Sequence, residues 1–206
     1  MKKLIVLLGI FGLLTGCNQA DDLPVIVTGE EQAIGTTFSE ELPDLSIYNL
    51  PSTWTNQDGQ EIELKDLRGK VVVMVMLYTS CKSSCPRLVA DMRNIERQMP
   101  EDYLDKIQFV MVSIDPETDT PERLKSFSEE NQMTEDHWMF LRGSEADTRE
   151  FAAVLAVSYK RISPIDFSHS NIISVFDQDG VLVHQKEGLG VDNEETIESI
   201  LHEAVN

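Results

Sequence analysis

The sequence predicts one α/β domain in which a central mixed sheet is covered by helices on both faces. Apolar, β-branched runs alternate with amphipathic helical patterns along the chain, and a hairpin and one last helix close it. The length of 206 residues suits a single domain with appendages. Hydrophobic residues make up 41% and charged residues 26%, which are globular proportions.

The first predicted elements are short strands followed by a long buried one. Residues 46–50 form a strand candidate, and residues 54–64 hold the turn signal Asp58-Gly59 between two more. Residues 71–77 (VVVMVML) are continuously apolar, which predicts a central strand buried on both faces. A helix follows the cysteine-containing segment, with an apolar stripe of Leu88, Met92, Ile95 and Met99.

Strands and helices then alternate. Residues 109–114 read as a second buried strand, and Thr120 and Pro121 are typical of the cap and first position of a helix. Residues 138–141 predict a short strand, followed by a helix near 145–156.

A hairpin and a helix close the domain. Residues 171–176 and 181–185 flank the turn Gln178-Asp179-Gly180, and residues 194–205 show one apolar helical face. The order β-α-β-α with a terminal β-β-α is the thioredoxin arrangement. Here it carries extra N-terminal strands and an inserted helix.

The N-terminus reads as an export signal. Lys2 and Lys3 precede eleven apolar residues, 4–14, and a transmembrane helix needs about 20. The run ends in Leu14-Thr15-Gly16-Cys17, which resembles a bacterial lipobox. We therefore expect cleavage before Cys17 and lipidation of that cysteine.

Three segments follow from this interpretation. Residues 1–16 are the lipoprotein signal peptide, residues 17–42 a flexible tether, and residues 43–206 the folded domain. The expected location is extracytoplasmic, lipid-anchored to a bacterial membrane, where disulfides persist. The formal charge of −19 excludes general binding to nucleic-acid phosphates and argues against electrostatic docking on anionic lipid heads.

Two cysteines remain for the domain. Cys81 and Cys85 lie where the strongest strand meets a helix, and their spacing puts both sulfurs on one side of the chain. The helix N-terminus, Lys82 and Arg87 favour thiolates, which are nucleophiles and soft metal ligands. Two thiolates suit Cu(I), and an added imidazole suits Cu(II). A structural disulfide is the alternative.

Of the four histidines, His169 is the candidate site residue. It lies in a predicted loop, 164–170, which in a thioredoxin arrangement faces the cysteine turn. His137, His184 and His202 favour packing or surface roles. The methionines lie in predicted strands and on helix stripes, which favours core packing over copper ligation.

Three motifs in order resemble the SCO/SenC family. They are Cys81-x-x-x-Cys85-Pro86, the stretch 112–121 (VSIDPETDTP), and residues 166–170 followed by a strand and Asp-x-Asp-Gly. That family comprises copper-binding, thioredoxin-fold proteins of cytochrome c oxidase assembly. The resemblance implies one copper bound by Cys81, Cys85 and His169, and a Cys81–Cys85 disulfide on oxidation.

The resemblance also implies partners. They are a copper donor and the copper-centre subunit of cytochrome c oxidase, or another copper acceptor. Many members carry an acidic residue between the cysteines and Asp before the histidine. This chain has Lys82-Ser83-Ser84 and Ser168 there, and Asp166 is a candidate to orient the imidazole instead.

The leading hypothesis is a metallochaperone rather than a turnover enzyme. The alternative is a thiol-disulfide oxidoreductase in which Cys81 and Cys85 are the redox-active pair. Redox signalling through the same site also stays open. A peroxiredoxin-type peroxidase is disfavoured because Met74 and Tyr78 break that family's approach to its cysteine. Zinc lacks an obvious fourth ligand.

Overall fold

A computed structural model describes residues 41–82, 84–190 and 192–205, which all belong to one compact unit. The predicted signal peptide, Cys17 and most of the predicted tether lie outside the described residues, so these stay predictions. No helix in the described part of the chain has the length and apolar character that crossing a membrane requires.

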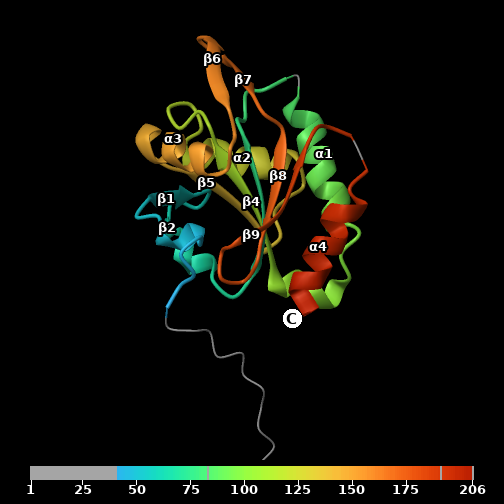
Figure 1. The fold of residues 1–206 in the computed structure, drawn as a ribbon. Helices are drawn as coiled ribbons and strands as arrows, with labels where there is room; N and C mark the ends of the chain where they lie inside the picture. The colour runs from blue at the N-terminus through green and yellow to red at the C-terminus, as the bar shows by residue number, and fades with distance from the viewer. Residues whose placement is uncertain (1–40, 83, 191, 206) are drawn as a thin grey trace, which may run out of the picture. The chain divides into compact units, whose positions relative to one another are not determined.

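A seven-stranded mixed sheet forms the centre of the domain (Figure 1), in the order β2-β1-β5-β4-β3-β8-β9. Strands β3, β4 and β5 are parallel, and the strands outside them pair antiparallel. This confirms the predicted central mixed sheet and its N-terminal additions. The strands are β1 (Thr53–Asn56), β2 (Glu61–Glu63), β3 (Val71–Leu77), β4 (Ile107–Ser113), β5 (Trp138–Arg142), β8 (Ile172–Phe176) and β9 (Leu182–Glu187).

Four α-helices flank the sheet, with α1 and α4 along one side and α2 and α3 toward the other (Figure 1). The predicted cap is confirmed, because the Thr120 side chain accepts from the backbone N–H of Arg123 at 3.3 Å. The helices are α1 (Cys85–Glu96), α2 (Pro121–Glu130), α3 (Glu145–Val154) and α4 (Glu194–Val205), with 3-10 helices η1 (Ile47–Asn49), η2 (Leu64–Leu67) and η3 (Glu101–Lys106).

The core lies on both faces of the parallel strands. Every residue of β3 and of β4 is buried, as a strand covered by helices on both faces must be. The methionines expected to pack there, Met74, Met76, Met92, Met99 and Met111, are all buried. The rigid centre of the sheet therefore supports the loop that follows β3, which holds both cysteines.

Two predictions about secondary structure are wrong. Residues 46–50 form the 3-10 helix η1 rather than a strand, because the Ser46 hydroxyl accepts from the Tyr48 N–H and donates to the Asp179 carbonyl. The loop predicted at 164–170 contains a strand, β7 (Asp166–His169), which pairs antiparallel with β6 (Tyr159–Ser163). The histidine therefore lies on a two-stranded hairpin.

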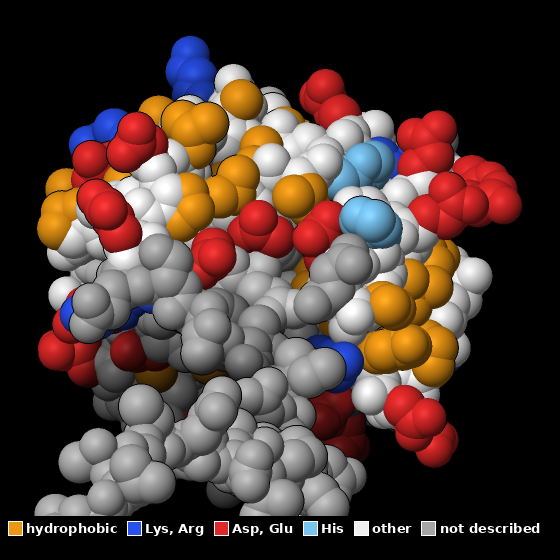
Figure 2. Space-filling model, turned by 60° about the horizontal axis from the view of Figure 1, so that its bottom comes forward, with side chains coloured by type: hydrophobic (Ala, Val, Ile, Leu, Met, Phe, Trp, Pro, Cys, Tyr) orange, Lys and Arg blue, Asp and Glu red, His pale blue; other side chains and the backbone are white. Residues whose placement is uncertain are grey.

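The face in Figure 2 carries Asp and Glu side chains over much of its described surface, with few Lys or Arg among them. That distribution agrees with the formal charge of −19.

Two turn glycines offer a test of the packing. Gly59 and Gly180 both have φ of +78°, but a Cβ on Gly180 would lie 2.8 Å from the Tyr48 ring, whereas one on Gly59 meets nothing within 4 Å. Gly59→Ala should cost about 1–2 kcal/mol of unfolding free energy, the left-handed backbone penalty alone. Gly180→Ala should cost about 1–3 kcal/mol more, through the added clash. Denaturant midpoints measure both, and equal losses would contradict the packing of η1 on this turn.

Candidate metal centre

The two cysteines are positioned by the transition from β3 to α1. The chain leaves the sheet at Leu77 and turns through Tyr78, whose carbonyl accepts from the Cys81 N–H at 3.3 Å. Cys85 begins α1, with Pro86 in the first helical turn, where its missing N–H costs nothing. The Cys85 N–H points at the Cys81 sulfur, at 3.4 Å, so this sulfur lies over the start of the helix.

The third side chain comes from the β6–β7 hairpin. His169 ends β7 and pairs in register with Tyr159 of β6. Its Nδ1 lies 2.8 Å from the carbonyl oxygen of Ser170, so Nδ1 carries the proton and donates. That hydrogen bond leaves Nε2 as the lone-pair atom, and Nε2 lies 3.5 Å from the Cys85 sulfur. A backbone carbonyl therefore sets the tautomer that a metal site needs.

The three donor atoms of Cys81, Cys85 and His169 all lie within 4.8 Å of one another. Donors around one ion at bond lengths of about 2.0–2.3 Å lie roughly 3.5–4.5 Å apart, so a single ion fits among them. Cys81 is 9% exposed and Cys85 1%. Thiolate sulfur is a soft donor and imidazole nitrogen a borderline one, and this set suits copper better than a hard cation such as Mg²⁺.

The protonation of Cys85 differs from the sequence expectation. Burial, and then the hydrogen bond with Cys81, raise the pKa of the Cys85 thiol well above its usual range. Burial of Cys85 therefore opposes the thiolate-favouring effect expected of the helix N-terminus. No disulfide joins Cys81 and Cys85 in this structure.

A buried acid holds the loop that leads to Cys81, and sequence reasoning missed it. Asp119 is fully buried, and its carboxylate accepts from the Thr79 N–H at 3.1 Å, the Thr79 hydroxyl at 2.5 Å and the Ser113 hydroxyl at 2.6 Å. Arg123 donates to the Thr79 hydroxyl and carbonyl from the solvent side. The signal was present, since Asp119 belongs to the stretch 112–121 that carries the family resemblance.

Asp166 does not partner the histidine. Its carboxylate accepts a short hydrogen bond from the Tyr78 hydroxyl, and Tyr78 also accepts from the Phe167 N–H at 3.2 Å. The suggestion that Asp166 orients the imidazole is therefore wrong, because the Ser170 carbonyl fills that role. Asp166 instead connects the histidine hairpin to Tyr78, the residue that directly follows β3.

The other three histidines lie away from the cysteines. His137 bonds Glu96 at 2.7 Å, His184 bonds the Thr196 hydroxyl at 3.0 Å, and His202 is on the surface with its side chain 74% exposed. These placements agree with the packing and surface roles expected for them.

The fold and the site together define a class: a thioredoxin-like α/β protein with a Cys-x-x-x-Cys pair and a hairpin histidine in reach of both sulfurs. Comparison with known proteins narrows the class. The SCO1/SenC family model matches residues 44–205. The chain therefore belongs to the SCO1/SenC family.

Individual relatives agree with that assignment. A SCO1 protein homolog of Bacillus subtilis is 30% identical over 146 residues, which cover 69% of this chain and 74% of the relative. The crystal structure of a SCO1/SenC family lipoprotein from Bacillus anthracis has 30% identity and a TM-score of 0.68, covering 74% of this chain and 92% of that one. Bradyrhizobium japonicum ScoI, solved with copper bound, has 25% identity and a TM-score of 0.60, covering 75% and 98%.

Proposed function

We propose that the protein binds one copper ion through Cys81, Cys85 and His169 and delivers it in maturation of the binuclear copper centre of cytochrome c oxidase. The convergence of three soft donors within 4.8 Å is the observation that carries the proposal. Family membership and the copper-bound state of the Bradyrhizobium relative support it. The lipobox-like Cys17 and the Bacillus anthracis lipoprotein support an extracytoplasmic, lipid-anchored location.

In this proposal copper is cargo, so the donors must release it stepwise. Cys81 is the more exposed sulfur and lies on the loop rather than in the helix. An incoming thiolate of an acceptor therefore displaces Cys81 first, and the buried Cys85 and the hairpin histidine follow. Oxidation of the pair to a disulfide removes both sulfur ligands together and prevents rebinding.

Copper titration of the reduced full-length protein tests the proposal. We expect one equivalent of Cu(II) to bind with strong thiolate-to-copper charge-transfer absorption. His169→Ala should alter those bands and weaken affinity by more than about tenfold, because loss of a ligand exceeds the usual effect of removing its supporting partner. His202→Ala, on the exposed surface, is the matched control and should match wild type.

Two outcomes would contradict the copper proposal. Unchanged affinity in His169→Ala would remove the histidine from the site. Oxidation of the cysteines by copper, with the metal left in solution, would remove the site altogether and leave thiol chemistry as the function.

One observation favours a second candidate, thiol-disulfide reduction of the acceptor's cysteines. Cys81 is 9% exposed and Cys85 1%, the asymmetry that an attacking and a resolving thiol require. The Cys81 thiolate would attack the acceptor's disulfide and form a mixed disulfide. Cys85 would then attack the Cys81 sulfur and release the acceptor as a dithiol. Reduction of insulin disulfides that survives His169→Ala would favour this candidate.

A further inference from the structure

Within the described residues, β6 and β7 pair only with each other, so the histidine hairpin shares no hydrogen-bonded strand with the seven-stranded sheet. His169 at its end must nevertheless hold Nε2 3.5 Å from the Cys85 sulfur. A site of this kind needs something that fixes the hairpin against the cysteine loop, because a ligand displaced by about 1 Å loses productive geometry.

Tyr78 makes that connection. It follows β3 directly, three residues before Cys81, and its side chain is fully buried. Its hydroxyl donates to the Asp166 carboxylate and accepts from the Phe167 N–H, so the phenol holds two consecutive residues of β7. The two hydrogen-bonded residues lie 88 and 89 positions away along the chain.

The ring of Tyr78 reinforces the connection. Its centroid lies 5.1 Å from that of Phe167 and 5.9 Å from that of His169, in edge-to-face arrangements. The hydroxyl and the ring of Tyr78 therefore contact the hairpin at Asp166, Phe167 and His169.

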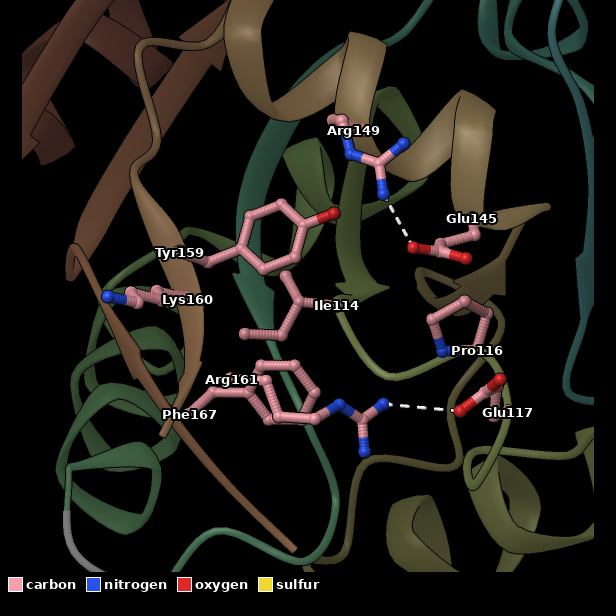
Figure 3. Close-up of a pocket in the computed structure, with 9 residues that line it drawn as sticks. All are labelled: Ile114, Pro116, Glu117, Glu145, Arg149, Tyr159, Lys160, Arg161 and Phe167. Carbon is pink, nitrogen blue, oxygen red and sulfur yellow. Dashed lines mark hydrogen bonds and ion pairs between the residues drawn. The ribbon is translucent and has the colours of Figure 1, made fainter. Parts of the chain in front are cut away.

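The face of the hairpin that carries His169 and Phe167 also borders an open cavity. Tyr159, Arg161 and Phe167 line a cavity whose volume is about 520 Å³. Glu117 lies across it from Arg161 (Figure 3). Arg161 lies over the Phe167 ring at 4.6 Å and pairs with the buried Asp115 at 3.0 Å, but its side chain is 41% exposed. Arg161 belongs to β6, whereas the buried Tyr78 hydroxyl bonds two residues of β7, so Tyr78 holds the strand that carries His169 more directly.

We propose that Tyr78 and Asp166 form a latch that holds the β6–β7 hairpin with His169 on the cysteine pair. Tyr78 and Asp166 position the hairpin and are not themselves proposed as metal ligands. The latch rests on the proposed copper function only in its expected effect on copper binding. Because it contacts the hairpin rather than the ion, it sets how firmly the third ligand is presented.

Hydrogen exchange and copper binding test the latch in four variants. Tyr78→Phe removes the hydroxyl but keeps the ring, and Asp166→Leu removes the acceptor. Asp166→Asn keeps an acceptor oxygen for the phenol. Tyr159→Phe is the matched control, because it removes a hydroxyl from the same hairpin without changing the latch.

We expect Tyr78→Phe and Asp166→Leu to accelerate amide exchange in residues 159–169 about tenfold or more, with exchange in β3 and β4 unchanged. Both should weaken Cu(II) binding by about tenfold and shift the charge-transfer bands toward those of His169→Ala. Asp166→Asn should keep most of the slow hairpin exchange and most of the copper affinity of the wild type. Tyr159→Phe should match wild type in both measurements. In a His169→Ala background, Tyr78→Phe should add no further loss of copper affinity.

The outcomes separate the latch from the copper function. If Tyr78→Phe shows the amide exchange and the copper affinity of the wild type, the latch is overturned, whereas the proposed copper site is unaffected. A wild-type protein that binds no copper would overturn the proposed function, and the exchange of the hairpin would still decide the latch. A uniform rise of exchange through β3 and β4 would show general destabilisation and would likewise overturn the latch.

Discussion

Asp119→Ala should lower the free energy of unfolding by about 2–4 kcal/mol, although Asp119 touches neither sulfur nor imidazole. The substitution leaves the buried Thr79 N–H without an acceptor, and an unsatisfied buried donor costs about 1–3 kcal/mol. The Thr79 and Ser113 hydroxyls lose the same acceptor, but they can rotate toward others, so their contribution is smaller.

Chemical denaturation measures this loss, with Asp105→Ala as the control. Asp105 is exposed in η3, so its removal should change stability by less than about 0.5 kcal/mol. The loop effect is separable from the global one, because Thr79 lies two residues before Cys81. Asp119→Ala should therefore also make Cys81 alkylate faster under native conditions. Equal stability of the two variants would show that the carboxylate is not the anchor of this loop.

Much of the fold is predictable because its signals are local. The seven consecutive apolar residues of β3 predict a buried strand, and Thr120-Pro121 marks the start of α2. The last helix also has the predicted bounds, 194–205. In each case the determining residues lie within one element, so no knowledge of distant neighbours is needed.

The wrong predictions concern elements that depend on distant partners. The 3-10 helix η1 is set by Ser46, whose hydroxyl reaches the Asp179 carbonyl 133 positions away. The strand β7 is short, with only Phe167 fully buried, so it lacks the alternation that marks a strand. No local sequence signal marks its pairing with β6, which is seen only in the structure, where the hairpin packs against Tyr78.

The candidate site also has local features that the sequence shows and distant contacts that it does not show. The spacing of Cys81 and Cys85 and the place of His169 before a buried strand are visible in the sequence. The groups that hold them are not, because Asp119 reaches Thr79 across 40 positions and Asp166 reaches Tyr78 across 88. The sequence therefore predicts which residues form the candidate site, whereas the structure shows what keeps them in place.

The largest expected functional effect belongs to Cys85. Cys85→Ser should weaken copper binding by more than about 100-fold, which is the upper range for removing an outer partner of a ligand. A serine hydroxyl has nearly the shape of the thiol but neither its softness nor its acidity. Ser84→Ala is the control, because the Ser84 hydroxyl lies 3.5 Å from His169 Nε2 and 3.8 Å from the Cys81 sulfur without being a predicted ligand. It should change affinity by less than about tenfold.

The pH dependence of binding gives an independent check on the same residue. Because burial raises the pKa of Cys85, its thiol is protonated near neutral pH, and copper must displace that proton. The apparent copper affinity of the wild type should therefore rise with pH, by up to about tenfold per unit for each proton released. Cys85→Ser should lose this contribution, because its hydroxyl has no proton to release in that range. The test covers roughly pH 6 to 8, where the thiol stays protonated. A wild-type copper affinity that does not change over this range would show that Cys85 does not bind the metal as a thiolate.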